Sequence, residues 1–147
     1  SDFSVKFKIK RNILYELLKQ KYRISVSYEP DYYQGVKTKF YWNLFNKKQG
    51  ICNCTKKCNG KGKGKGNGDC KRVTIAIFQS GNINISAQSF CQIKDAYLFI
   101  NQILYNEYEL VKREEIKIKK TDELINQSKI YIEKNKITNF AIYQSLL

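Results

Sequence analysis

Four of the five cysteines lie in one short stretch of the chain. Cys52, Cys54, Cys58 and Cys70 follow the spacing C-x-C-x3-C-x11-C. Four thiolates complete the tetrahedral coordination of a structural zinc ion, and the first three are close enough in sequence to form a tight ligating turn. Two disulfides in an oxidising compartment are the second interpretation, and four unbonded thiols are the third. The spacing alone leaves all three open.

A glycine–lysine alternation lies between the third and fourth of these cysteines. Lys61, Lys63 and Lys65 alternate with glycine, which predicts a mobile basic segment that cannot place a charge accurately. Such a segment can still release counterions near phosphates. The stretch is not a phosphate-binding P-loop, because the pattern Gly-x-x-x-x-Gly-Lys-Ser/Thr is missing.

Catalytic groups are scarce. The chain has no histidine, which excludes Ser-His and Cys-His nucleophile activation and histidine metal ligation. Glu29 and Asp31 form the one tight acidic pair on the predicted globular part, and they lie on a turn. The sequence therefore predicts a protein without catalytic activity.

The charge points to an anionic partner. The 147 residues include 27 Lys and Arg against 13 Asp and Glu, a formal net charge of +14. This excess favours nucleic acid or an acidic membrane surface as partner, with a merely solvated surface as the alternative. No apolar run approaches a membrane span and no signal peptide is recognisable, so we expect an intracellular protein without membrane association. The absence of methionine, even at position 1, suggests a fragment or a processed product.

Hydrophobic periodicity predicts an antiparallel sheet with helices on one face. The strands are expected at 3–9, 23–27, 36–44, 73–79 and 82–86, and the helices at 12–22 and from Ser89 to Leu104. Asn12 is the expected N-cap of the first helix, and Ser89 with Gln92 forms a capping box for the second. Residues 1–105 would form the lobe, with an insertion at 46–71. Residues 106–147 would form a charged, largely helical extension, capped near Thr121.

The hairpin around Ser80-Gly81 has two different faces. One face carries only aliphatic residues: Val73, Ile75, Ile77, Ile83 and Ile85. The other carries small, amide and hydroxyl residues with one aromatic: Thr74, Ala76, Phe78, Asn82, Asn84 and Ser86. The aliphatic face is expected to pack under the helices, which leaves the other face open.

Two landmarks connect this pattern to a known family. Residues 28–36 read Tyr-Glu-Pro-Asp-Tyr-Tyr-Gln-Gly-Val, and residues 77–81 read Ile-Phe-Gln-Ser-Gly. With the order of elements, residues 2–104 resemble one repeat of the TATA-box-binding protein (TBP) family, most closely the second repeat. The cysteine-bearing insertion is most similar to TBP-like proteins of nucleocytoplasmic large DNA viruses, of the African swine fever virus kind.

The resemblance implies an α+β lobe with a curved five-stranded antiparallel sheet and two helices on its convex face. In this family the concave face lies on the DNA minor groove and aromatic wedges enter base steps. Carried over to this sequence, the wedges are Tyr33 and Phe78, and the phosphate contacts are Lys39 and Arg72. The implied minor-groove contacts are Ser4, Thr74, Ala76, Asn84 and Ser86.

The turn after the second strand, called the stirrup in this family, implies a protein partner. It docks transcription factor IIB, and the matching positions are Glu29, Asp31 and Tyr32. The implied function is transcription initiation with the RNA polymerase machinery, in the cytoplasmic viral factory for a viral protein and otherwise in the nucleus. The alternative is an adaptor lobe that has lost TATA-box recognition and binds only proteins.

Overall fold

The computed structural model describes residues 1–45, 50–52, 54, 58, 61–64, 66, 68–114, 126–127 and 129. The chain divides into two compact units, Ser1–Arg113 and Glu114–Leu147. In the second unit the described residues Asn126, Gln127 and Lys129 are helical. The remainder of the predicted extension helix, including Thr121, lies outside the described residues.

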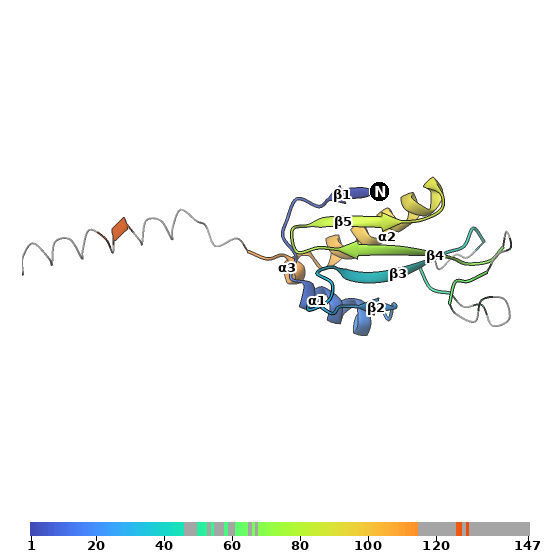
Figure 1. Ribbon diagram of the computed structural model, residues 1–147, viewed down its shortest axis with the longest axis horizontal. Helices are drawn as coiled ribbons and strands as arrows, with labels where there is room; N and C mark the ends of the chain where they lie inside the picture. The colour runs from blue at the N-terminus through green and yellow to red at the C-terminus, as the bar shows by residue number, and fades with distance from the viewer. Residues whose placement is uncertain are drawn as a thin grey trace, which may run out of the picture. The chain divides into compact units, whose positions relative to one another are not determined.

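The first unit is an α+β lobe built on an open antiparallel sheet (Figure 1). Its five strands are β1 (Asp2–Ser4), β2 (Val26–Ser27), β3 (Val36–Trp42), β4 (Lys71–Ile77) and β5 (Asn82–Ser86). They are arranged in the order β1-β5-β4-β3-β2. The predicted five-stranded antiparallel sheet and the α+β class are therefore confirmed.

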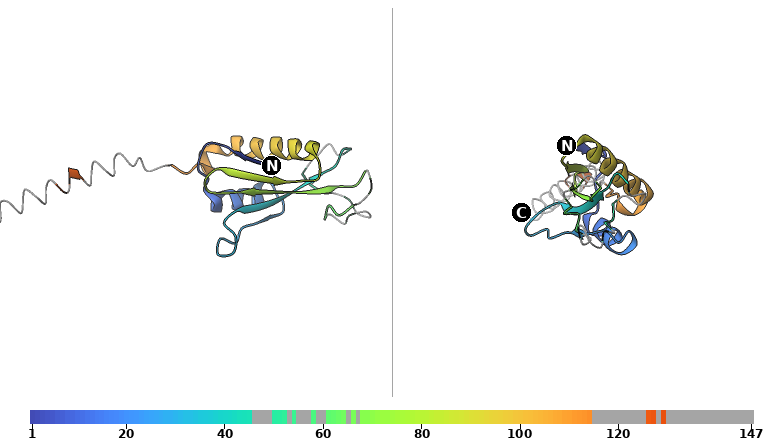
Figure 2. Two further views of the ribbon diagram at one scale, coloured as in Figure 1. Left: turned by 45° about the horizontal axis from the view of Figure 1, so that its top comes forward. Right: turned by 90° about the vertical axis from the view of Figure 1, so that its right-hand side faces the viewer.

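The helices cover one face of this sheet and leave the other open (Figure 2). They are α1 (Arg11–Glu16), continued by the π-helical segment η1 (Leu17–Lys21), then α2 (Phe90–Asn106) and α3 (Tyr108–Val111). Within the described residues, no helix combines the length and apolar character needed to cross a membrane.

The core lies between the aliphatic face of the hairpin and these helices. Ile75, Ile77 and Ile85 of the sheet are buried in one cluster with Ile100 and Leu104 of α2. This arrangement follows from the period-two alternation of β4 and β5, which places every second residue on the same side. The predicted division of the hairpin into an apolar and an open face is confirmed.

The first strand is much shorter than predicted. Lys6 adopts a positive φ of 64°, a conformation that interrupts strand geometry in a residue with a side chain. Just before Lys6 the backbone N–H of Val5 donates to the Gly81 carbonyl at 3.0 Å, and after it the backbone N–H of Ile9 donates to the Gln79 carbonyl at 2.9 Å. Residues 5–9 thus follow the hairpin turn while Ile9 remains buried, and the strand prediction for 3–9 is wrong beyond Ser4.

Both predicted helix starts can be compared with the observed caps. The N-cap of α1 is Lys10, with no capping side chain, so the prediction of Asn12 was wrong. At α2 the Ser89 hydroxyl accepts from the Gln92 backbone N–H at 3.4 Å, as predicted. The Gln92 side chain instead accepts from the backbone N–H of Gln88 at 3.0 Å.

The lobe continues past α2 through a small polar cluster. The buried Glu107 carboxylate accepts hydrogen bonds from Lys21 Nζ and, at 2.8 Å, from the Tyr22 hydroxyl. Val111 is fully buried, and its carbonyl accepts from the Lys10 backbone N–H at 2.7 Å. The lobe therefore includes residues 106–113, which the sequence analysis assigned to the extension.

Candidate metal centre and nucleic-acid interface

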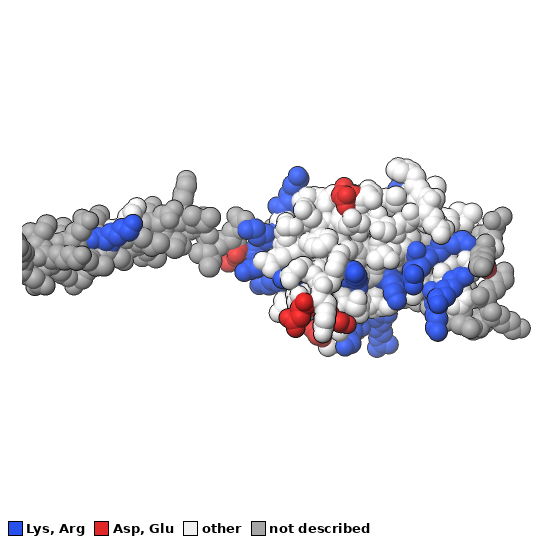
Figure 3. All heavy atoms as spheres, viewed as in Figure 1, with Lys and Arg blue, Asp and Glu red and all other residues white. Residues whose placement is uncertain are grey.

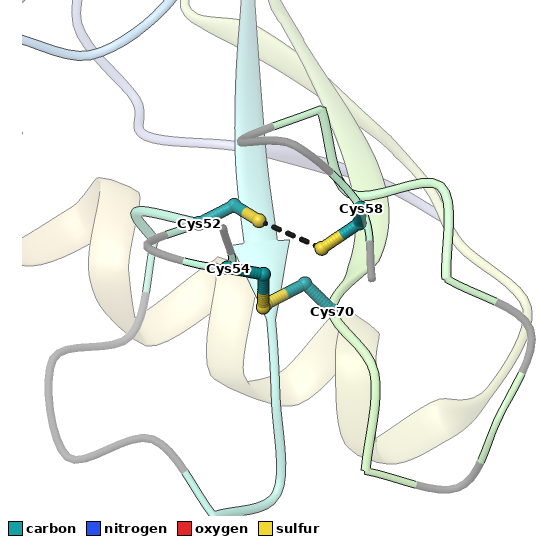
Figure 4. A group of neighbouring side chains, drawn as sticks. All are labelled: Cys52, Cys54, Cys58 and Cys70. Atoms are coloured by element: carbon teal, nitrogen blue, oxygen red, sulfur yellow. Dashed lines mark hydrogen bonds between the residues drawn. The ribbon is translucent and has the colours of Figure 1, made fainter. Parts of the chain in front are cut away.

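The structure brings all four cysteines of the insertion together (Figure 4). Their sulfur atoms lie within 4.8 Å of one another, and all four are free thiols. The Sγ atoms of Cys52 and Cys58 are 3.0 Å apart and those of Cys54 and Cys70 are 3.5 Å apart. Tetrahedral zinc with bonds of about 2.3 Å places its sulfurs about 3.8 Å apart. This group could therefore hold a metal ion.

The ends of β3 and β4 position the cysteine group. Cys70 immediately precedes β4. Tyr41 of β3 exchanges two backbone hydrogen bonds of 3.1 Å with Gly50, two residues before Cys52. The Asn43 amide donates to the Gly68 carbonyl at 3.0 Å and to Cys70 Sγ at 3.5 Å. The group forms its own buried cluster, separate from the sheet core.

The thiols of this group do not titrate alike. Burial raises the pKa of Cys52, but hydrogen bonds from Cys58 and from the backbone of Cys54 and Gly62 outweigh it and lower this pKa to about 7. The hydrogen bond to Cys52, together with burial, raises the pKa of Cys58 to about 11. The group thus offers one readily formed thiolate, which is the form that binds metal, and metal binding would release the remaining protons.

The glycine–lysine stretch is packed against the strands where the structure describes it. A Cβ added to Gly62 would lie 2.3 Å from the Tyr41 ring, and one on Gly64 would lie 2.0 Å from the Asp69 Cβ. Lys63 forms an antiparallel bridge with Lys71. In residues 61–64 the glycines therefore face the packed side, while Lys61 and Lys63 are exposed. Lys65 lies outside the described residues.

The predicted DNA contacts of the sheet share its open face. The strand register aligns Lys39 with Thr74 and Thr74 with Ser86. Ala76 is aligned with Asn84 in the same way. The other two predicted contacts of the sheet are Arg72, which pairs with Tyr41, and Ser4, which pairs with Asn82. Ala76 is only 7% exposed, so its neighbours cover most of its side chain; its partners in the register are Lys37 and Asn84.

The two predicted wedge residues lie in contact beside this face. The ring centroids of Tyr33 and Phe78 are 5.9 Å apart. The loop that carries Tyr33 projects from the side of the sheet opposite α2 (Figure 2, left). Lys37 places its Nζ 3.6 Å from the centre of the Tyr33 ring, so a cation accompanies the aromatic pair.

Arg11 is a positioning residue that the sequence did not reveal. Its guanidinium donates to the Gln34 carbonyl and, at 2.8 Å, to the Gln34 side chain. It also donates to the Gln79 side chain at 3.0 Å. Arg11 therefore ties the loop of Tyr33 to the turn that follows Phe78. No local signal could have indicated this, because the partners are far from Arg11 in sequence.

Two acidic features lie near the predicted interfaces. Glu29 and Asp31 are exposed on the loop, and Tyr32 beside them is 88% exposed. Asp2 lies on the open face, where its carboxylate accepts from the Asn84 amide at 2.7 Å. The three predicted partner-binding residues are thus accessible together. The fifth cysteine, Cys91 of α2, is exposed.

Comparisons of the chain with models of protein families, with curated proteins and with solved structures found no match.

Proposed function

We propose that the chain is a TBP-like transcription initiation factor that binds double-stranded DNA through the open face of its sheet, without catalysis. The observation that carries the proposal is the contact between Tyr33 and Phe78 at this face, with Lys37 on the Tyr33 ring. Aromatic side chains beside a sheet can enter a base step from the minor groove and bend the duplex.

The side chains of the face suit such a contact. Exposed Lys39 and Arg72 offer cations to phosphates on the β3 and β4 side. Thr74 and Ala76 of β4 have short side chains, which suits a close approach of the minor groove to the sheet. Phosphate contacts then position the duplex, while shape and A·T content determine preference.

A binding titration tests the proposal. Fluorescence anisotropy of AT-rich and GC-rich duplexes is measured at two salt concentrations. We expect tighter binding to the AT-rich duplex and a loss of affinity with added salt, because released counterions contribute to binding. Absence of binding at the lower salt concentration would reject the proposal.

A protein adaptor is the second candidate function. The exposed Tyr32 directly follows Asp31 and offers an aromatic anchor with Glu29 and Asp31 as acidic neighbours in sequence, and aromatic anchors dominate many protein interfaces. The Asp2 carboxylate on the open face opposes phosphate and favours this alternative. An adaptor would bind a transcription factor IIB-like protein in a manner lost in Tyr32→Ala, and it would show no affinity for either duplex.

The cysteine group is assigned to one structural zinc ion in this proposal. The four thiol donors match the closed coordination of structural zinc sites, which leave no position for substrate. Zinc would join both ends of the insertion to the strands and would take no part in chemistry. The proposed place of action is the cytoplasmic viral factory if the chain is viral, and the nucleus otherwise.

A further inference from the structure

A basic hollow lies beside the cysteine group. Of the residues that line it, only Arg72 is among the DNA contacts implied by the family resemblance. The hollow is lined by Gly62, Lys63, Gly64, Lys71, Arg72 and Gln88. Three cations thus surround it, and within the described part of the chain none of them forms an ion pair with a carboxylate. Figure 3 shows basic side chains gathered on this end of the open face.

Backbone contacts give these cations defined places. Lys63 forms an isolated antiparallel bridge with Lys71, the first residue of β4. The Lys71 Nζ donates to the Gly64 carbonyl at 2.8 Å, which holds the glycine–lysine stretch against the strand. The alternation therefore acts like a strand, with glycines packed inward and lysines outward.

The cysteine group anchors both ends of this stretch. The Lys61 backbone N–H donates to the carbonyl of Cys58 at 2.8 Å. Cys70 directly precedes Lys71. A metal ion bound to the four thiolates would therefore link the segment that carries Lys63 to the strand that carries Lys71 and Arg72.

We propose that the metal-loaded cysteine group fixes this hollow as a second phosphate-binding site, for backbone phosphates of the DNA lying on the open face. This inference rests on the proposed function. Arg72 connects the two sites because it lies on the open face through its register with Tyr41 and also lines the hollow. A duplex lying across the sheet would place a phosphate beyond the end of β4 within reach of Lys63.

The salt dependence of DNA binding tests this site. The binding constant of the AT-rich duplex is measured against salt concentration for the wild type, Lys63→Gln and the control Lys94→Gln. Lys63 and Lys94 are both exposed, but Lys94 lies on α2 at the opposite face of the sheet. Loss of one phosphate contact should reduce the slope of log K against log salt by about 0.9 in Lys63→Gln and leave Lys94→Gln unchanged.

Two further measurements test whether the phosphate contact depends on where the glycine–lysine stretch places Lys63. Gly64→Ala keeps every charge but would push the stretch away from Asp69, so it should reduce the slope as Lys63→Gln does. Removal of metal from the wild type with a chelator should also reduce the slope, and should add little to Lys63→Gln. Circular dichroism confirms that the sheet is retained in each sample.

The outcomes separate the two proposals. If the wild type binds DNA and Lys63→Gln has the slope of Lys94→Gln, the second phosphate site is wrong and the proposed function stands. If Lys63→Gln reduces the slope while Gly64→Ala and the chelator do not, the metal-fixed placement is wrong. If the wild type binds no DNA at the lower salt concentration, both proposals fail.

Discussion

The rings of Tyr33 and Phe78 lie 5.9 Å apart between centroids and are inclined by 57°. We predict that Phe78→Ala weakens DNA binding by about tenfold or more, because loss of an inserted ring removes a contact of a few kcal/mol. Tyr33→Ala should cost less, since insertion of the tyrosine ring also removes water from its hydroxyl. Anisotropy titrations compare the two variants. An equal loss in both, or no loss, would contradict the assignment of the wedges.

Gly35 lies beneath these rings and offers a way to move them. A Cβ at this position would lie 2.7 Å from Tyr33 Cε1 and 3.1 Å from Phe78 Cε1. Gly35→Ala should therefore weaken DNA binding while it changes the free energy of unfolding by less than about 1 kcal/mol, because the exposed Tyr33 ring can shift. Denaturant unfolding and anisotropy measure the two effects.

Gly81→Ala provides the contrasting control. Gly81 has a φ of +89°, and a Cβ there would lie 2.2 Å from the Phe7 carbonyl oxygen. This backbone neighbour cannot rotate away, so a loss of about 1–3 kcal/mol or more in stability is expected. If Gly35→Ala destabilised the lobe as strongly as Gly81→Ala, the freedom ascribed to the Tyr33 ring would be wrong.

Glu107 makes the free energy of unfolding depend on pH in the acidic range. Its hydrogen bonds from Lys21 and Tyr22 lower the pKa of the carboxyl. Because the folded-state pKa lies below that of the unfolded chain, the stabilisation is complete above about pH 4.3 and is lost as the pH falls through the folded-state pKa. Glu107→Gln should lower the melting temperature by a few degrees at pH 7 and progressively less in acid.

The exposed Glu109 provides the matched control. It lies in α3 and forms an ion pair with Lys112, the residue that follows this helix. Glu109→Gln should leave the melting temperature nearly unchanged, because exposed ion pairs contribute little. Thermal unfolding followed by circular dichroism from pH 3 to pH 7 distinguishes the variants. A Glu107→Gln difference that stays constant over this range would contradict the role given to the ionised carboxylate.

The cysteine group should bind close to one equivalent of zinc. Elemental analysis of protein purified without chelator measures this, and Cys54→Ser should lower the zinc content. Because the group is separate from the sheet core, chelation should increase hydrogen exchange in residues 50–70 while the sheet stays folded. Less than half an equivalent of zinc, or disulfides detected by mass spectrometry of unreduced protein, would argue against the metal centre.

Local patterns predicted the parts of the lobe that depend on local rules. The hairpin of β4 and β5 followed from alternation, because its two faces meet different surroundings. The cysteine group followed from residue type and spacing, since a ligand set is recognisable before the fold is known. The family resemblance identified Tyr33 and Phe78 as wedge residues, but it did not predict that their rings are in contact.

The errors arose where distant neighbours decide. Lys6 interrupts the first strand although its sequence continues to alternate, because residues 5–9 bond to the turn at Gln79 and Gly81. The sequence around Gly62 and Gly64 predicts a flexible segment. In the structure, the absence of a side chain at these positions lets Tyr41 pack against Gly62 and Asp69 against Gly64. Neither contact has a local signal, so only the tertiary structure reveals it.

The central claim is that DNA binds the open face of the sheet, and a charge placed on each face tests it most directly. Ser86→Glu puts a carboxylate on the exposed open side of β5, and Gln102→Glu puts one on the exposed side of α2. With the AT-rich duplex, Ser86→Glu should raise the dissociation constant about tenfold or more, because like charges at an interface cost several kcal/mol. Gln102→Glu should remain within about twofold of the wild type, since a charge distant from the interface is screened. Equal effects of the two substitutions would contradict binding through the open face.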